Sequence, residues 1–272
     1  MSEKKLQDKI VLITGTSPNI GGGIAEGLAE VGAKVVCVDI HPENANQCAA
    51  AIVNRGGQAI GEVCDVTNEE QVKTTVERAK SAYGGVDILV NSAVIFNQKG
   101  VLDMSLAEWT RQTSIILTGT FLFTKYVAQQ MIDQKRLGNI INIISTAGHQ
   151  GQPRNVGYCT GKSGLLNFTR SVAMELVDYG IRVNSLTPTA TDPNEGIERA
   201  ERWGQPIRNT QQLRSVFEPF RKGAPLRKLP SPRHYAKAIA FLASDDAEMI
   251  TGVDLRVDAG TIARYWAWTP EN

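Results

Sequence analysis

Short apolar segments alternate with longer segments of helical periodicity along most of this chain. The apolar segments are rich in valine, isoleucine and leucine at nearly continuous positions, which predicts strands buried on both faces. The intervening segments, of which the first begins at Ile24, have the length and pattern of helices. Strands are predicted at 9–14, 34–39, 58–64, 86–90, 138–145, 181–186 and 252–258, and further helices at about 44–56, 68–83, 105–136, 158–179 and 233–244.

Regular alternation of strand and helix predicts an α/β fold, in which helices cover both faces of a parallel sheet. We find no repeat or linker, so residues 1–272 are expected to form a single domain. Right-handed crossovers bring the carboxyl ends of parallel strands to one edge, where ligands bind in such folds. The residues at those ends are Gly15, Asp39, Asp65, Asn91, Ser145 and Pro188. Their convergence predicts a ligand site at that edge.

Two segments depart from the alternation. Residues 192–230 are rich in charge, with aromatic residues spaced through them, and we interpret them as a substrate lid. The alternative is a solvated helix pair with no gating role. Residues 261–272 form a tail that contains Tyr265, Trp266 and Trp268. Such aromatics are expected to be buried, either on their own subunit or on the lid of a neighbouring one.

The first strand is followed by a glycine-rich turn and then by a helix. In this order, Gly15 permits a tight turn and Gly21 permits a pyrophosphate to approach the amides at the helix start. A turn of this kind without a ligand is the alternative. Asp39, which ends the second strand, is placed to accept hydrogen bonds from a ribose diol and would repel a 2′-phosphate. Together the two features favour NAD over NADP.

Tyr158 and Lys162 are four positions apart, so they share one face of the predicted helix. The phenol of tyrosine titrates near pH 10, and an ammonium group beside it is expected to bring that pKa down towards neutrality. Ser145 ends the preceding strand, where its hydroxyl could hold the substrate oxygen on which the tyrosine acts. This set suits general acid/base catalysis at an alcohol or a ketone.

Composition excludes several other classes of protein. The formal net charge is +1 over 272 residues, which provides no basic surface for nucleic acid or an anionic membrane. No apolar run is long enough to span a bilayer, and residues 1–9 do not resemble a secretory signal. The four cysteines lack C-x-x-C spacing and a histidine cluster, so we expect no metal and no disulfide framework. A cytoplasmic protein is expected.

The motifs together resemble those of the short-chain dehydrogenase/reductase family, from about residue 6 to 260. The matching residues are Thr14, Gly15, Asn19, Ile20, Gly21, Asp65, Asn91, Ala93, Ser145, Tyr158, Lys162, Asn184, Pro188 and the closing segment 250–260. The resemblance implies a doubly wound (Rossmann) sheet of about seven parallel strands, a nicotinamide cofactor, and dimers or tetramers. A helix at 115–128 that is apolar nearly all round also favours an interface between subunits.

The resemblance also assigns roles. Tyr158 is expected to act as acid/base, Lys162 to bind the nicotinamide ribose and lower the phenol pKa, and Ser145 to orient the substrate oxygen. Ser145 and Tyr158 are thus the expected substrate-binding residues. The expected NAD-binding residues are Gly15, Ser17, Asn19, Ile20, Gly21, Asp39, Ile40, Asp65, Val66, Asn91, Ala93, Tyr158, Lys162, Pro188 and Thr191.

One departure from the family pattern concerns the proton relay. Ile116 occupies the position where family members usually carry an asparagine, which is thought to position a water between the lysine and solvent. Thr113, Thr120 or a freed backbone carbonyl could replace it. The leading hypothesis is an NAD-dependent enzyme that interconverts a secondary alcohol and a ketone. The alternatives are a catalytically weakened NAD-binding protein, and a dehydratase or epimerase built on the same fold.

Overall fold

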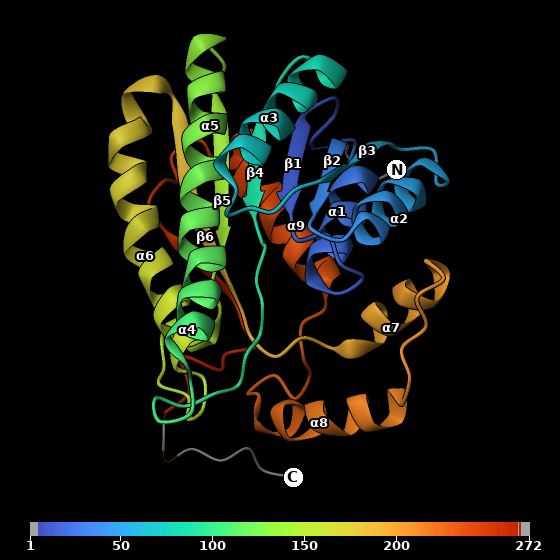
Figure 1. Ribbon diagram of the computed structural model, residues 1–272, viewed down its shortest axis with the longest axis vertical. Coiled ribbons are helices and arrows are strands. Elements are labelled where there is room, and N and C mark those ends of the chain that lie inside the picture. Colours follow the sequence, from blue (N-terminus) through green and yellow to red (C-terminus); the bar gives the residue numbers. More distant parts are fainter. Residues whose placement is uncertain (1–4, 266, 268–272) are drawn as a thin grey trace.

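A single parallel sheet organises the computed structural model, which describes residues 5–265 and 267 (Figure 1). Its seven strands run in the order β3-β2-β1-β4-β5-β6-β7, and all six neighbouring pairs are parallel. The strands are β1 (Ile10–Thr14), β2 (Lys34–Asp39), β3 (Gln58–Val63), β4 (Ile88–Asn91), β5 (Gly138–Ile143), β6 (Ile181–Pro188) and β7 (Asp254–Val257). The predicted doubly wound sheet of about seven strands is confirmed. The strand order reverses beside β1, which places a ligand crevice between the ends of β1 and β4.

Alternate side chains of the central strands enter two separate cores. Val11 and Ile13 of β1 pack on one face of the sheet, whereas Leu12 between them packs on the other. The first core includes α1 (Ile20–Glu30), α2 (Pro42–Val53) and α9 (Pro232–Ala243). The second includes α3 (Glu69–Tyr83), α5 (Gly119–Asp133) and part of α6 (Val156–Leu176). Burial on both faces is the physical reason that the strands are apolar at consecutive positions.

The region predicted as one helix at 105–136 has three parts. Helix α4 (Leu106–Thr113) begins at a capping box in which Ser105 and Glu108 each accept a backbone hydrogen bond. A π-helical turn, Ser114–Thr118, follows, and α5 then continues to Asp133. Periodicity did not reveal the π turn, because one extra residue in a turn scarcely changes a pattern of apolar positions.

The apolar residues of the 115–128 segment are mostly buried within the same chain. Leu122, Phe123 and Val127 lie in the second core, and Ile116 packs on α6, while Phe121 remains about half exposed. The apolar pattern of this segment is therefore largely explained by intramolecular packing. It does not by itself require a second subunit, and the predicted dimer or tetramer stays a prediction.

The proposed lid, 192–230, consists of two helices below the sheet (Figure 1). Helix α7 (Pro193–Arg202) contains four buried residues, whereas α8 (Thr210–Gly223) contains none. The two halves of the predicted lid therefore differ in how firmly they are packed. In the tail, Tyr265 is exposed. Trp266 and Trp268 lie outside the described residues, so the predicted burial of these two side chains stays a prediction.

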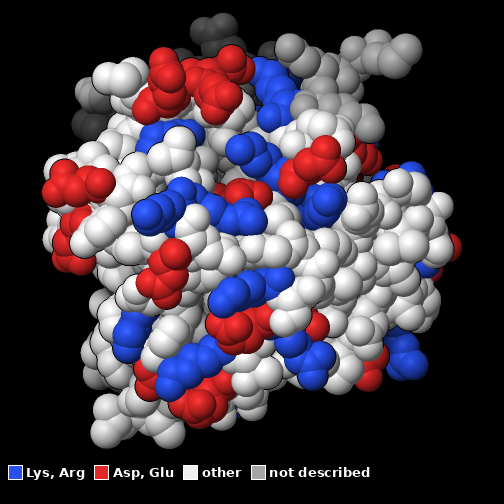
Figure 2. Space-filling model, turned by 90° about the horizontal axis from the view of Figure 1, so that it is seen from above, with Lys and Arg blue, Asp and Glu red and all other residues white. Residues whose placement is uncertain are grey.

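Charged side chains of both signs are interspersed on the face seen in Figure 2, without a large field of one sign. Among the described residues, no helix has both the length and the apolarity needed to cross a membrane. The same residues hold no group of three or more potential metal ligands, and the four cysteines are free thiols.

Candidate active site

A cavity of about 310 Å³ lies at the carboxyl edge of the sheet, where the strand order reverses. Its wall combines the glycine-rich turn, the ends of β2 and β4, and the first half of α6. Most of the residues expected to hold NAD line this cavity: Gly15, Ser17, Asn19, Ile20, Gly21, Asp39, Ile40, Asp65, Val66, Ala93, Tyr158, Lys162 and Pro188. Segments from six parts of the chain thus meet in one place.

The glycine-rich turn is packed too closely for side chains. Gly15 has φ +75°, and a Cβ added there would lie 2.8 Å from the Cα of Ala93. A Cβ on Gly21 would lie 2.0 Å from the carbonyl oxygen of Gly15. The Asn19 side chain does not cap α1, so the first amides of this helix have no side-chain acceptor. An anion such as a pyrophosphate fits this helix start.

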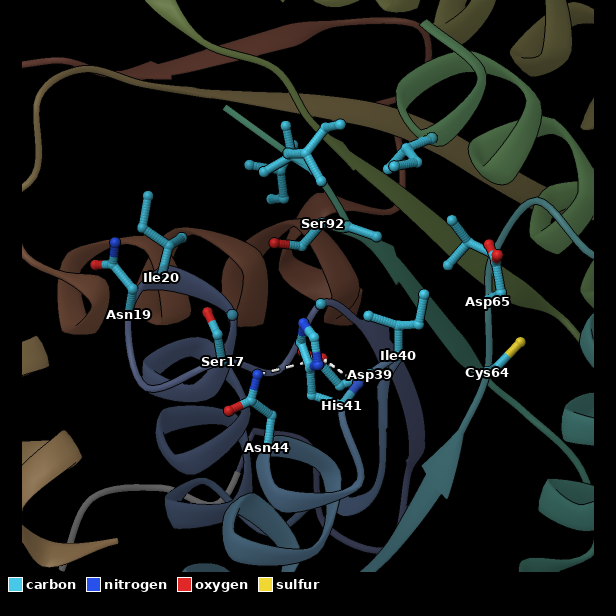
Figure 3. A pocket seen from close by; sticks show the side chains of 18 of the residues that line it. Ser17, Asn19, Ile20, Asp39, Ile40, His41, Asn44, Cys64, Asp65 and Ser92 are labelled. Atoms are coloured by element: carbon cyan, nitrogen blue, oxygen red, sulfur yellow. Dashed lines mark hydrogen bonds between the residues drawn. The ribbon is translucent and has the colours of Figure 1, made fainter. Parts of the chain in front are cut away.

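Asp39 is held in place at the end of β2 (Figure 3). Its Oδ1 accepts hydrogen bonds from the backbone N–H of His41 at 3.0 Å and from Nδ2 of Asn44 at 3.2 Å. Only 7% of Asp39 is exposed, and the residue borders the cavity. With Oδ1 occupied, Oδ2 is the oxygen left to accept from a ribose hydroxyl.

Two expected cofactor-binding residues do not line this cavity. Asn91 turns inward, where its Nδ2 donates to Asn142 Oδ1 at 2.9 Å and to Thr124 Oγ1 at 3.2 Å. Asn91 therefore joins β4 to β5 behind the cavity wall. Thr191 borders a second cavity of about 390 Å³, which lies between the glycine-rich turn and helices α7 and α8. The Thr191 hydroxyl shares a hydrogen bond with that of Tyr235 at 2.9 Å.

Tyr158 and Lys162 enter the cavity from α6, as their spacing predicts. The Nζ of Lys162 lies 5.9 Å from the centre of the Tyr158 ring and donates to the backbone oxygen of Ile143 at 2.6 Å. Burial lowers the pKa of Lys162 to about 7. Burial raises the pKa of Tyr158, and a hydrogen bond with the side chain of Ser145 opposes this effect only partly.

Without a bound cofactor, the pKa of Tyr158 is therefore raised. The sequence predicted the opposite, a pKa lowered by the ammonium group of Lys162. The physical reason is desolvation: Lys162 is buried and Tyr158 is partly enclosed by the cavity wall, and loss of water disfavours an ammonium and a phenolate alike. The Lys162 ammonium is moreover directed at the carbonyl of β5. The sequence gives the spacing of the two residues but not their desolvation.

Ser145 follows β5 and is placed by the short 3-10 turn after it. Its hydroxyl oxygen accepts from the backbone N–H of Ala147 at 3.1 Å. Although Ser145 is not part of the cavity wall, its hydrogen bond with Tyr158 joins it to the site. On the other side of the phenol, the Phe96 ring packs edge to face against Tyr158, with the ring centres 5.2 Å apart.

The cavity also contains residues that we did not anticipate from the sequence. They are His41, Asn44, Cys64, Ser92, Val94, Ile95, Arg111, Ile115, Ile143 and Ile144. Some of these residues directly follow a predicted strand end: His41 follows Ile40, and Ser92, Val94 and Ile95 follow Asn91. Including the few positions after each strand would have identified them. Arg111 lies on α4 and had no such signal. Cys64 stays a thiol, because burial raises its pKa to about 11.

Ile116 lies in the π-helical turn and is 1% exposed. A Cβ on Gly161 of α6 would lie 2.9 Å from Ile116 Cδ1, so the isoleucine fills the space that the glycine leaves. Thr113 already donates its hydroxyl to the Trp109 carbonyl at 2.8 Å. At the end of the turn, the N–H of Gly119 donates to the carbonyl oxygen of Ser114, five residues earlier. An α-helical hydrogen bond spans four residues, so the pattern of backbone hydrogen bonds is shifted by one position here. The Thr113 hydroxyl is thus already engaged, and Thr120 and a backbone carbonyl stay candidates to replace the missing asparagine.

Comparisons with known proteins agree with this geometry. Residues 15–261 match the family model described as Enoyl-(Acyl carrier protein) reductase. The chain is 35% identical over 259 residues to the 3-oxoacyl-[acyl-carrier-protein] reductase of Aquifex aeolicus, with 95% of this chain and 99% of the relative covered. A short-chain type dehydrogenase/reductase from Mycobacterium marinum superimposes with TM-score 0.83 at 31% identity, covering 96% of this chain and 98% of that one. An NAD⁺-bound xylitol dehydrogenase superimposes with TM-score 0.82 at 31% identity, covering 93% and 98%.

Proposed function

This chain belongs to the short-chain dehydrogenase/reductase family, and within that family we propose that it is an NAD-dependent enzyme that interconverts a secondary alcohol and a ketone. One observation carries the proposal: a single cavity connects Asp39 and the glycine-rich turn to Tyr158 and Lys162. A cofactor that lies along this cavity would place its reactive end beside a side chain able to move a proton.

The residues present fit a dinucleotide. The glycine-rich turn and the uncapped start of α1 would hold the pyrophosphate, and Asp39 Oδ2 would hold the adenosine ribose. When bound, the cofactor would supply the hydride acceptor for alcohol oxidation as NAD⁺ and the hydride donor for ketone reduction as NADH. The NAD⁺-bound relative also supports this choice of cofactor. Arg111 also borders this cavity, and an arginine can pair with the 2′-phosphate of NADP. The test therefore includes NADP as well as NAD.

Tyr158 would exchange a proton with the substrate oxygen, which the Ser145 hydroxyl would orient. The pKa of Tyr158 is raised, so the phenol is protonated at neutral pH and suited to donate to a ketone oxygen. Lys162, when protonated, would stabilise the phenolate that this donation leaves. The Phe96 ring packs edge to face against the ring of Tyr158. Assembly into a dimer or tetramer and a cytoplasmic location are further parts of the proposal.

Turnover with NAD⁺ or NADP⁺ across a panel of secondary alcohols, and with NADH or NADPH across the matching ketones, tests this function. Tyr158→Phe should reduce turnover by roughly 10²- to 10⁴-fold, the contribution of a general acid/base, while cofactor affinity survives. Substantial turnover by Tyr158→Phe would rule out the assigned role. Cofactor binding without turnover by the unmodified protein would favour the weakened NAD-binding alternative, and a product formed without net cofactor reduction would favour a dehydratase or epimerase.

A further inference from the structure

A buried arginine of helix α7 donates hydrogen bonds to the glycine-rich turn. Only 5% of Arg199 is exposed, although it lies within the segment predicted to be a lid. Its Nη1 donates to the backbone oxygens of Pro18 at 3.1 Å and Asn19 at 3.3 Å. Both carbonyls belong to the turn between β1 and α1 that borders the cofactor cavity.

A buried carboxylate holds the arginine in this position. Glu26 of α1 is 4% exposed, and its Oε2 accepts from Nε of Arg199 at 3.2 Å. Arg202 donates to the same oxygen at 3.0 Å, and the indole N–H of Trp203 donates to Oε1 at 3.3 Å. Burial raises the pKa of Glu26, but the arginines outweigh this effect and lower it overall. The carboxylate is therefore ionised and its charge is compensated.

Two glycines make room for this arrangement. A Cβ on Gly23 would lie 2.8 Å from Nη2 of Arg199 and 2.3 Å from Cβ of Pro232. A Cβ on Gly22 would lie 2.6 Å from Cη2 of Trp203 and 2.5 Å from the Ser17 carbonyl oxygen. The approach of a pyrophosphate explains Gly21 but not the two glycines after it. Their small size matches the side chains that α7 inserts against α1.

Peptide geometry links these contacts to the cavity. In a trans peptide the C=O and the following N–H point in opposite directions, and the described chain has no cis peptide bond. Arg199 donates to the carbonyls of Pro18 and Asn19, and the Asn19 carbonyl also accepts from the N–H of Gly23 at 3.2 Å. The N–H groups of Asn19 and Ile20 therefore point away from Arg199. Asn19 and Ile20 both line the cofactor cavity, and Figure 3 shows them beside Ser17.

We propose that Arg199 is a positioning residue for cofactor binding, which sets the orientation of the amides that receive the pyrophosphate. The inference rests on the proposed function, since it requires that a dinucleotide binds at this turn. Helix α7 is then a fixed part of the cofactor site. Any lid movement is confined to α8, which has no buried residue.

The test compares Arg199→Met with Arg202→Met by calorimetric titration. Arg202 shares Glu26 as a partner but bonds no carbonyl of the turn in the described structure, so it is the matched control. The two probes are ADP-ribose, which contains the pyrophosphate, and adenosine, which contains no phosphate. Arg199→Met should weaken ADP-ribose binding by about 10- to 100-fold and leave adenosine affinity within about twofold. Arg202→Met should change both affinities by less than about threefold.

Further variants separate positioning from folding. Arg199→Lys keeps the charge beside Glu26 but cannot bridge two carbonyls and a carboxylate, so it should give an intermediate loss of ADP-ribose affinity. This variant decides the question if Arg199→Met does not fold. Turnover of Arg199→Lys at saturating NAD should stay within about threefold of the unmodified enzyme. Equal weakening of adenosine and ADP-ribose binding, or unchanged ADP-ribose binding in both Arg199 variants, would overturn this inference and leave the proposed function standing. An unmodified protein that binds neither NADH nor ADP-ribose would instead overturn the proposed function.

Discussion

Lys162→Met should make the stability of the protein without cofactor depend less on pH. Burial lowers the pKa of Lys162 from its ordinary value of 10.5 to about 7. Between these two values the unfolded chain binds a proton at this lysine that the folded chain does not, so the stability of the unmodified protein rises with pH. Methionine has a similar shape and carries no proton, so this contribution disappears in the variant.

The pKa difference sets the size of the effect. Burying the lysine costs about 4 kcal/mol at pH 7 and about 1 kcal/mol at pH 10, so the relative stability of Lys162→Met should change by about 3 kcal/mol across this window. Removing the amine also leaves the Ile143 carbonyl without its partner. That loss costs about 1–3 kcal/mol, but it does not depend on pH because a neutral amine donates as well. The pH dependence is therefore the diagnostic quantity.

Urea denaturation of both proteins at intervals between pH 6.5 and 10 measures this quantity. The variant should gain stability relative to the unmodified protein as the pH falls from 10 to 7. All other titrating groups are common to the two proteins, so their contributions cancel to first order in the difference. A stability difference that stays constant over this range, or that moves in the opposite direction, would refute the assignment of a desolvated lysine at this position.

Two further variants test the cofactor site and the π-helical turn. Asp39→Ala combined with His41→Arg should raise kcat/KM for NADP relative to that for NAD by at least about tenfold, because a carboxylate no longer repels the 2′-phosphate. Equal kcat/KM values of the unmodified enzyme with the two cofactors would contradict this role of Asp39. Ile116→Asn should lower the free energy of unfolding by about 1–3 kcal/mol, because an amide would replace an apolar side chain packed on Gly161. Denaturation at one pH measures it, and an equally stable variant would show that the site tolerates the asparagine usual in the family.

Local features of the sequence determined the sheet and much of the site. Runs of apolar residues predicted the strands, because a strand with helices on both faces buries consecutive side chains. The glycine-rich turn, Asp39 and the Tyr158–Lys162 spacing were recognisable because each depends on a few neighbouring residues. Once the strands are parallel, their carboxyl ends share an edge, so the convergence of these residues follows from topology.

The tertiary structure decided what depends on contacts between distant segments. Arg199 and Glu26 are 173 positions apart, and no periodicity in either helix indicates that they pair. The direction of the Lys162 and Tyr158 pKa shifts depends on how much water the folded chain excludes, which no local pattern encodes. Asn91 stands at the predicted strand end, yet its side-chain amide donates to Asn142 on the neighbouring strand and does not line the cavity. Residue spacing determines which side chains can meet, whereas desolvation and the choice of hydrogen-bond partner are properties of the packed molecule.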